Sequence, residues 1–358
     1  MARENGIGLS LSGGGYRAML YHLGTVIRLH ETGLIGRLSR ISSVSGGSIT
    51  AGVLALRWSQ INSREDLFDH VVDPVRALAG RTIDRPSILR GRFLPGGVAR
   101  YVAKQYDKHL FKGASLQQIP ASPRFVINAT NLETGVLWRF SKPYMRDYRV
   151  GSIDNPDLPL ADAVTASSAF PPFLSPYKLK VSPDAFTIRE PGVPDSFFSD
   201  ISLTDGGVYD NYGLEPIWDR YTNVLVSDGG GSLPLEASPA PGWGRQTYRV
   251  LNVIHQQVHS IRSRQVVQAY NDGDMQGAFW SIRTPVSRYP VKMPDAPTDE
   301  QGRALAETPT RLKKMSTSLQ EQLINFGYAS CDASLRSYFD ASITPPGKLP
   351  YPDREFGS

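Results

Sequence analysis

Residues 6–50 constrain the fold of this chain more than any other stretch. Two short apolar runs, residues 7–11 and 40–44, each lead into a turn of small residues and then into a helical pattern. Parallel strands of α/β proteins deliver loops to one edge of a sheet in this way. We therefore predict an α/β fold in which the two loops open side by side at the same sheet edge.

The two loops carry complementary chemical groups. The first contains three consecutive glycines, Gly13, Gly14 and Gly15, whose backbone N–H groups can face a single negative charge. The second places the hydroxyl of Ser45 on a tight strand-to-helix turn, with the amide of Gly46 next to it. Backbone amides that face a serine hydroxyl are typical of an oxyanion hole beside a nucleophile, so we predict these roles for the two loops.

A phosphate-binding site is the main alternative for the glycine loop, because the helical pattern over residues 17–31 would place a helix N-terminus there. The dinucleotide fingerprint G-x-G-x-x-G does not fit cleanly, and the Lys-Ser/Thr pair that ends a P-loop is absent. These departures favour acyl transfer over nucleotide binding.

A general base for Ser45 has two candidates later in the chain. An apolar strand pattern over residues 201–205 delivers Asp205 onto the turn formed by Gly206 and Gly207. A carboxylate held at a strand end by two glycines is well placed to accept a proton from a serine. Asp228 follows another apolar run and also precedes glycines, so composition and spacing leave both aspartates open.

Histidine would be the base in a catalytic triad, and the chain order of α/β-hydrolases would place it after the acid. His255 and His259 satisfy that order and lie four residues apart in a helical pattern over residues 248–270. The same spacing suits a metal pair, but neither an H-E-x-x-H motif nor a third ligand accompanies it. We therefore interpret this segment as a solvent-facing or structural helix and predict no metal site.

Composition narrows the class of protein. The chain has 358 residues, of which 40% are hydrophobic and 20% charged, and no apolar run approaches the roughly 18 residues that span a bilayer. The first residues lack a signal-peptide pattern, which favours a cytoplasmic location.

A net charge of +5 suits an anionic lipid surface at the inner face of a membrane, whereas the dispersed basic residues argue against nucleic acid. The single cysteine, Cys331, excludes an intrachain disulfide.

Four motifs occur in order along the chain: Ser-Gly-Gly-Gly-Tyr-Arg-Ala at 12–18, Ser-Val-Ser-Gly-Gly-Ser at 43–48, Ala-Ser-Ser-Ala-Phe-Pro-Pro-Phe at 166–173 and Thr-Asp-Gly-Gly-Val-Tyr-Asp-Asn at 204–211. Together they resemble the patatin-like phospholipase family, and the first resembles the branch shared with cytosolic phospholipases. The resemblance implies a three-layer α/β/α fold with a mostly parallel central sheet, and a Ser-Asp dyad in place of a triad. The implied site consists of the nucleophile Ser45, the base Asp205, the oxyanion glycines Gly13, Gly14 and Gly15, the loop-shaping Arg17, and the supporting Gly46, Gly206 and Gly207.

The resemblance covers residues 6–231, and residues 308–312 and 323–329 resemble the ending of bacterial members. We expect one domain over 1–358, with a helical completion at about 245–340 and a tail at 345–358. Ser43 replaces the first glycine of the G-x-S-x-G elbow, and Ser12 replaces an aspartate of many plant-type members, but neither change removes a catalytic atom. No cofactor is expected, and calcium dependence is not carried over.

The predicted function is hydrolysis of fatty-acyl esters in phospholipids or lysophospholipids through an acyl-enzyme. Two alternatives keep the same fold. One is a latent effector that degrades membrane lipids after activation by a ligand or partner, and the other is a scaffold without hydrolytic activity. Binding at a membrane surface is expected, and the sequence leaves the oligomeric state open.

Overall fold

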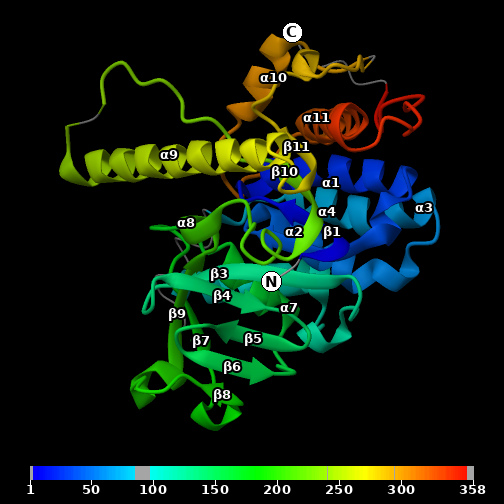
Figure 1. The fold of residues 1–358 in the computed structure, drawn as a ribbon. Coiled ribbons are helices and arrows are strands. Elements are labelled where there is room, and N and C mark those ends of the chain that lie inside the picture. Colours follow the sequence, from blue (N-terminus) through cyan, green and yellow to red (C-terminus); the bar gives the residue numbers. More distant parts are fainter. Residues whose placement is uncertain (1–2, 85–96, 240, 294, 353–358) are drawn as a thin grey trace.

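The structure is a computed structural model that describes residues 3–84, 97–239, 241–293 and 295–352. Within these ranges the chain forms a mixed α/β fold around one sheet of eleven strands, with helices on both faces (Figure 1). The five strands at the heart of the sheet are parallel. They are, in spatial order, β11 (Gln276–Ser281), β10 (Tyr221–Asp228), β1 (Glu4–Leu11), β2 (Leu38–Val44) and β3 (Arg124–Asn131).

Antiparallel strands extend the sheet beyond β3. One path continues through four short strands: β4 (Val136–Phe140), β5 (Tyr144–Asp147), β6 (Gly151–Asp154) and β8 (Ile188–Arg189). The other path pairs β9 (Asp200–Asp205) with both β3 and β7 (Tyr177–Lys180). The predicted α/β class with a mostly parallel central sheet is confirmed, and the antiparallel strands form its outer part.

One edge of β3 is shared by two strands that approach from opposite directions. Val44, the last residue of β2, pairs with Asn128, and Asp205, the last residue of β9, pairs with Ala129. Asn128 and Ala129 also pair with β4 on the opposite edge of β3, so β2 and β9 must occupy the same edge. The ends of β2 and β9 therefore meet, although they are far apart in the sequence.

Helices cover the sheet on two sides, which gives the three-layer architecture. Side chains of β10 alternate between two apolar clusters, as expected for a strand buried on both faces. Leu225 joins the main core, whereas Val224 and Val226 join a smaller core with Val266 and Ala269 of α9 (Trp243–Asn271). The main core contains residues of α1 (Gly15–Glu31), α2 (Gly46–Arg57), α7 (Leu160–Ser167) and α11 (Thr317–Ser334).

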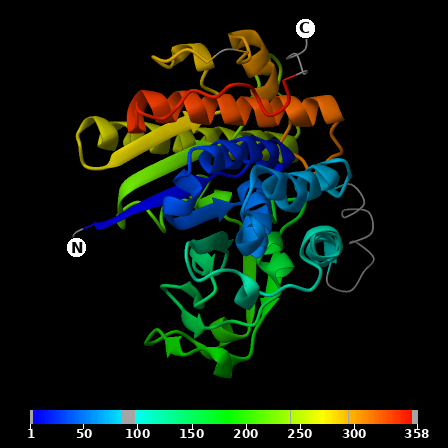
Figure 2. The same cartoon turned by 90° about the vertical axis from the view of Figure 1, so that its right-hand side faces the viewer.

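Helices α1 and α11 lie side by side over the sheet (Figure 2). Two glycines permit this approach. A Cβ atom on Gly24 would lie less than 3.0 Å from the carbonyl oxygen of Ile324, and one on Gly327 would be equally close to that of Tyr21. The backbones of the two helices are therefore in direct contact, which the predicted helical completion at about 245–340 does not by itself reveal.

The remaining helices are short. They are α3 (Arg64–Leu67), α4 (Asp73–Ala79), α6 (Gly97–Tyr106), α8 (Gly207–Asp210) and α10 (Asp299–Ala306). The segment after α11 packs back against this helix. Tyr351 and Asn325 of α11 form two hydrogen bonds with each other, at 2.8 and 3.0 Å. No helix of the described residues is long and apolar enough to span a bilayer.

Candidate active site

Ser45 lies at the turn between β2 and α2, where the sequence predicts the nucleophile. Its backbone has φ 52° and ψ −119°, a left-handed conformation that costs a non-glycine residue on the order of 1–3 kcal/mol. The backbone N–H of Ser45 donates to Ser167 Oγ at 3.0 Å, and the residue is only 6% exposed. The turn is therefore strained at the residue that the sequence predicts to be the nucleophile.

The two glycine loops are in backbone contact, as their predicted position at one sheet edge requires. A Cβ atom on Gly46 would lie less than 3.0 Å from the carbonyl oxygen of Gly15. A Cβ atom on Gly47 would collide in the same way with the backbone of Leu11, the last residue of β1. Side chains at these positions would push the triple-glycine loop away from Ser45.

The three predicted oxyanion glycines are not equivalent. The N–H of Gly13 donates to the carbonyl oxygen of Asn211 at 3.0 Å. Gly14 and Gly15 have positive φ angles, of 147° and 61°, and their N–H groups have no hydrogen-bond acceptor among the residues that the structure describes. Gly14 and Gly15 are therefore the two whose amides remain available to a bound group.

Asp205 is buried at the end of β9, on the turn predicted to carry the base. Its Oδ1 accepts the N–H of Gly207 at 2.7 Å, whereas Oδ2 has no hydrogen-bond partner within the described part of the chain. The Ser45 hydroxyl interacts with the carboxyl and lowers its pKa, although the two side chains are not in standard hydrogen-bond geometry. Burial has the larger, opposite effect and raises the pKa of Asp205 to about 6.

Gly206 lets the Asp205 turn lie directly on β3. A Cβ atom at Gly206 would be less than 3.0 Å from the carbonyl oxygen of Asn128. The Gly206 N–H donates to the carbonyl oxygen of Ser167 at 3.2 Å. The Asp205 turn and the Ser45 turn are thus both fastened to Ser167, one by a backbone and one by a side-chain oxygen.

Asp228, the competing candidate for the base, is fully engaged elsewhere. Its Oδ1 accepts from the Gly230 N–H at 2.9 Å and contacts His259 Nε2 at 3.1 Å, while Oδ2 accepts from Ser281 Oγ at 2.7 Å. Burial alone would raise the pKa of Asp228, but His259 and Arg283 hold it below its usual range. Because β1 separates β10 from β2, two strand spacings of about 4.8 Å place the end of β10 about 10 Å from the Ser45 turn.

His259 belongs to the Asp228 cluster and not to the Ser45 turn. Its Nδ1 is 3.0 Å from the hydroxyl of Tyr212, and its ring also contacts Arg283. His255, one helical turn earlier, is exposed. No group of three or more His, Cys, Asp or Glu side chains among the described residues could hold a metal ion. His259 is thus a structural residue of the Asp228 cluster, whereas His255 faces solvent.

Two residues of the site were not singled out from the sequence. Ser167 lies in the quoted Ala-Ser-Ser-Ala motif; its Oγ accepts from the Ser45 N–H, donates to the carbonyl oxygen of Asn128 at 2.6 Å and contacts Ser48 Oγ at 2.9 Å. Asn211 holds the Gly13 amide, and its side chain occupies the space next to Gly13 where a Cβ atom would lie. Both residues lie inside the motifs quoted in the sequence analysis, at 166–173 and 204–211, and this position was the available signal.

Arg17, which the resemblance implies shapes the glycine loop, lies in the first turn of α1 directly after that loop. Its side chain is buried, and Nε donates to the carbonyl oxygen of Gly229 at 3.1 Å. The terminal nitrogens reach the carbonyl oxygen of Thr308 and, at 3.0 Å, Thr310 Oγ1. Arg17 therefore ties the start of α1 to the turn after β10 and to the segment before α11.

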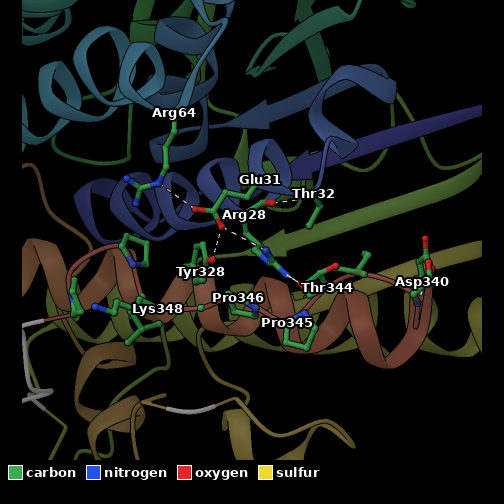
Figure 3. Close-up of a pocket in the computed structure, with 16 residues that line it drawn as sticks. Arg28, Glu31, Thr32, Arg64, Tyr328, Asp340, Thr344, Pro345, Pro346 and Lys348 are labelled. Carbon is green, nitrogen blue, oxygen red and sulfur yellow. Dashed lines mark hydrogen bonds and ion pairs between the residues drawn. The ribbon is translucent and has the colours of Figure 1, made fainter.

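A groove of about 820 Å³ lies at the opposite end of α1 (Figure 3). Both of its arginines are paired with carboxylates: Arg28 with Asp332 at 2.7 Å, and Arg64 with Glu31 at 3.3 Å. A helical rise of about 1.5 Å per residue puts Arg28 about 20 Å from the triple glycine. None of the predicted site residues lines this groove, so the candidate active site is elsewhere.

Comparisons with known proteins yield a matching family model and solved structures that are similar to this chain. A family model described as patatin-like phospholipase matches residues 9–218. Human GIVD cytosolic phospholipase A2 in complex with methyl gamma-linolenyl fluorophosphonate superposes with a TM-score of 0.52 at 15% identity, over 92% of this chain and 57% of the human chain.

Two further solved structures are less similar. Another structure of human GIVD cytosolic phospholipase A2 has a TM-score of 0.46 at 13% identity, over 66% of this chain, which spans about half, 49%, of the human chain. VipD from Legionella pneumophila has a TM-score of 0.39 at 13% identity, over 94% of this chain and 68% of VipD. No curated protein matches the chain. Since the family model covers more than half of its length, the chain belongs to the patatin-like phospholipase family.

Proposed function

We propose that this chain is a serine hydrolase that cleaves fatty-acyl esters of phospholipids or lysophospholipids with Ser45 and Asp205. One observation carries the proposal. Among the described residues, Asp205 keeps a buried carboxylate oxygen without a hydrogen-bond partner, and the hydroxyl of Ser45 lowers the pKa of this carboxyl. Buried polar atoms in folded proteins are nearly always paired, so an unpaired carboxylate oxygen next to the strained Ser45 turn indicates a functional site.

In the first step, Ser45 Oγ attacks the ester carbonyl carbon while its proton passes to Asp205 Oδ2. The amides of Gly14 and Gly15 donate to the oxyanion that forms, and Gly13, whose amide is engaged by Asn211, keeps the loop in place. When the tetrahedral intermediate collapses, the ester C–O bond breaks and Asp205 returns the proton to the leaving alcohol. The product is an acyl-Ser45 ester and a free lysolipid or glycerophosphodiester.

In the second step, Asp205 removes a proton from water, and the resulting hydroxide attacks the acyl-Ser45 carbonyl. Collapse of this second intermediate breaks the bond to Ser45 Oγ, which takes the proton back from Asp205 and releases the fatty acid. A pKa of about 6 suits both steps, because the carboxyl is ionised at neutral pH and still binds a proton more readily than an exposed aspartate does.

The surroundings of Asp205 suit an apolar acyl chain. Phe173 is 51% exposed, and the loop that carries it begins at Ala169, whose carbonyl oxygen accepts the Asp205 N–H at 3.0 Å. Val208 and Tyr209, which follow the Asp205 turn in α8, are also exposed. Apolar side chains at the rim of a site with one nucleophile favour a lipid ester over a water-soluble one.

Labelling with an alkyl fluorophosphonate, followed by peptide mass spectrometry, tests the proposal. We expect one adduct, on Ser45, and none in Ser45→Ala. Fatty-acid release from a mixed panel of phospholipids and lysophospholipids should be lost in the same variant. A folded protein that is never labelled would favour the scaffold, and labelling that appears only with an added activator would favour the latent effector.

A further inference from the structure

Helix α9 is the most exposed long element of the described chain. It has 29 residues, of which only His259, Val266 and Ala269 are buried, all in its C-terminal half. Figure 1 shows the N-terminal half of α9 extending beyond the sheet. Helices of this length in globular proteins normally bury one apolar face, so the covering of α9 is incomplete in the chain as described.

The exposed surface of α9 is apolar along one side. Trp243 is 83% exposed, and large aliphatic side chains follow at helical spacing in the order Val250, Leu251, Ile254, Val258 and Ile261. All five are exposed, and intervals of one, three and four residues place them within one stripe of the helix. Contiguous apolar surface of this kind marks an interaction site.

The charge of α9 has one sign. The 29 residues contain four arginines and neither aspartate nor glutamate. Arg249 and Arg262 form ion pairs with Glu236 and Glu215, whereas Arg245 and Arg264 have no acidic partner among the residues described. A basic helix with an apolar stripe and an exposed tryptophan is typical of a helix that lies in a membrane interface.

We propose that α9 docks the protein on an anionic membrane, with its apolar stripe at the boundary between headgroups and acyl chains. Unpaired Arg245 and Arg264 would then contact the lipid phosphates. A second copy of the chain is a less suitable occupant, because two acid-free α9 helices would bring like charges together. A membrane with negative lipids supplies both an apolar layer and the opposite charge.

The position of α9 connects docking with the candidate active site. Tyr248 of α9 and Phe173 make an edge-to-face contact, with ring centroids 6.1 Å apart. Phe173 lies on the loop that begins beside Asp205, so a membrane bound to α9 would also face the rim of the site. This use of the docking surface rests on the proposed lipid hydrolysis, whereas binding itself can be measured without it.

Vesicle sedimentation tests the proposal on the full chain. We compare vesicles of phosphatidylcholine alone with vesicles that also contain phosphatidylglycerol, for the unmodified protein and for two multiple variants. The first replaces the apolar stripe, Leu251→Gln/Ile254→Gln/Val258→Gln, and the second removes the unpaired charges, Arg245→Gln/Arg264→Gln. A matched control, Ile188→Gln/Tyr338→Ser, removes exposed apolar side chains elsewhere.

We expect binding only to the phosphatidylglycerol vesicles. Affinity should fall at least tenfold in the apolar variant and by about fivefold per arginine in the charge variant, and it should be unchanged in the control. Raising the salt from about 0.1 M to about 1 M should weaken binding, because the Debye length falls from about 10 Å to about 3 Å. Equal binding to neutral vesicles, or unchanged binding by both α9 variants, would overturn the proposal.

Two further measurements distinguish membrane docking by α9 from docking through another surface and from dimerisation. Brominated lipids should quench the fluorescence of the unmodified protein more than that of Trp243→Phe; equal quenching would place Trp243 outside the membrane and contradict docking by α9. Analytical ultracentrifugation of the apolar variant should show the same oligomeric state as the unmodified protein, and a dimer that dissociates in this variant would make a second copy the occupant.

Hydrolysis of a soluble p-nitrophenyl ester reports Ser45 chemistry without vesicles. Both α9 variants should keep this activity, and Ser45→Ala should lose it while it still binds vesicles. If the unmodified protein binds vesicles but does not hydrolyse the ester, only the proposed function is contradicted. If it hydrolyses the ester but does not bind vesicles, only the docking proposal is contradicted.

Discussion

Val44 and Asp205 pair with consecutive residues of β3, Asn128 and Ala129, on the same strand edge. Ser45 follows Val44 directly, so this register places the candidate nucleophile beside the candidate base. Asp228 ends a strand that β1 separates from β2, and its carboxylate is already paired. The two aspartates, which follow the same local pattern in the sequence, therefore have opposite roles in our proposal: one is free to react and the other holds the fold.

Substitution of the two aspartates should separate these roles. We expect Asp205→Asn to lower kcat/KM for a p-nitrophenyl ester by about 100-fold or more, because the proton acceptor is lost. Asp228→Asn should instead destabilise the protein by about 3 kcal/mol, because it leaves Arg283 and its neighbours without a buried counter-charge. Ester hydrolysis and thermal unfolding of both variants check the ranking. Greater loss of activity per folded molecule in Asp228→Asn would make Asp228 the base.

The pH profile of ester hydrolysis should follow Asp205. Burial raises the pKa of this carboxyl to about 6, and only its ionised form accepts the Ser45 proton. We therefore expect kcat/KM to rise about tenfold per pH unit below pH 6 and to level off above pH 7. Rates measured in overlapping buffers between about pH 4.5 and 8.5 test this. A midpoint near pH 4 would show that the base is not a buried carboxyl.

The same carboxyl should lower the stability of the folded protein. Its pKa is raised from 3.8 to about 6 on folding, so the folded state binds the proton more tightly and loses stability as pH rises through this interval. Two pKa units correspond to about 3 kcal/mol. Asp205→Asn should therefore raise the free energy of unfolding by about 1–3 kcal/mol at pH 8 and leave it nearly unchanged at pH 4. Urea unfolding at the two pH values measures the difference.

Gly46 tests the contact between the two glycine loops. In Gly46→Ala the new methyl group would collide with the Gly15 carbonyl, so we expect a loss of about 1–3 kcal/mol in stability together with a large fall in kcat. Gly244, in the exposed part of α9, has open space around it. Gly244→Ala should leave activity unchanged and gain up to about 1 kcal/mol from helix propensity. Full activity in Gly46→Ala would show that the contact between the two loops is not needed for catalysis.

Ser167 is expected to position the nucleophile without touching the substrate. Ser167→Ala leaves the buried Ser45 N–H without its acceptor, which should cost about 1–3 kcal/mol and lower kcat more than it raises KM. Ser141 provides the comparison, because its buried hydroxyl has no partner within the described residues. Ser141→Ala should therefore be close to neutral. Equal effects on stability and kcat in the two variants would exclude a special role for Ser167.

Local patterns predicted the elements that hold the candidate site. The runs at 7–11 and 40–44 became β1 and β2, and the helices after them begin at Gly15 and Gly46. These predictions were possible because strand, turn and helix each depend on neighbouring residues. The assignment of catalytic roles to Ser45 and Asp205 stays a prediction.

Contacts between distant segments could not be predicted from the sequence. The register that joins Val44 and Asp205 through β3 is one such contact, and the bond from Gly13 to the Asn211 carbonyl is another. The apolar stripe of α9 illustrates the same limit. The sequence left residues 248–270 open as a solvent-facing or a structural helix, and only the packing shows that Leu251, Ile254 and Val258 have no described element over them.

The shared edge of β3 also determines when the proposed activity can arise during synthesis. Asp205 leaves the ribosome 160 residues after Ser45. At 5–20 residues per second this interval is on the order of 10–30 s. Throughout that time the growing chain contains the proposed nucleophile and the glycine loop but lacks the proposed proton acceptor. In the proposed mechanism, no fragment that ends before Asp205 can therefore cleave a lipid ester.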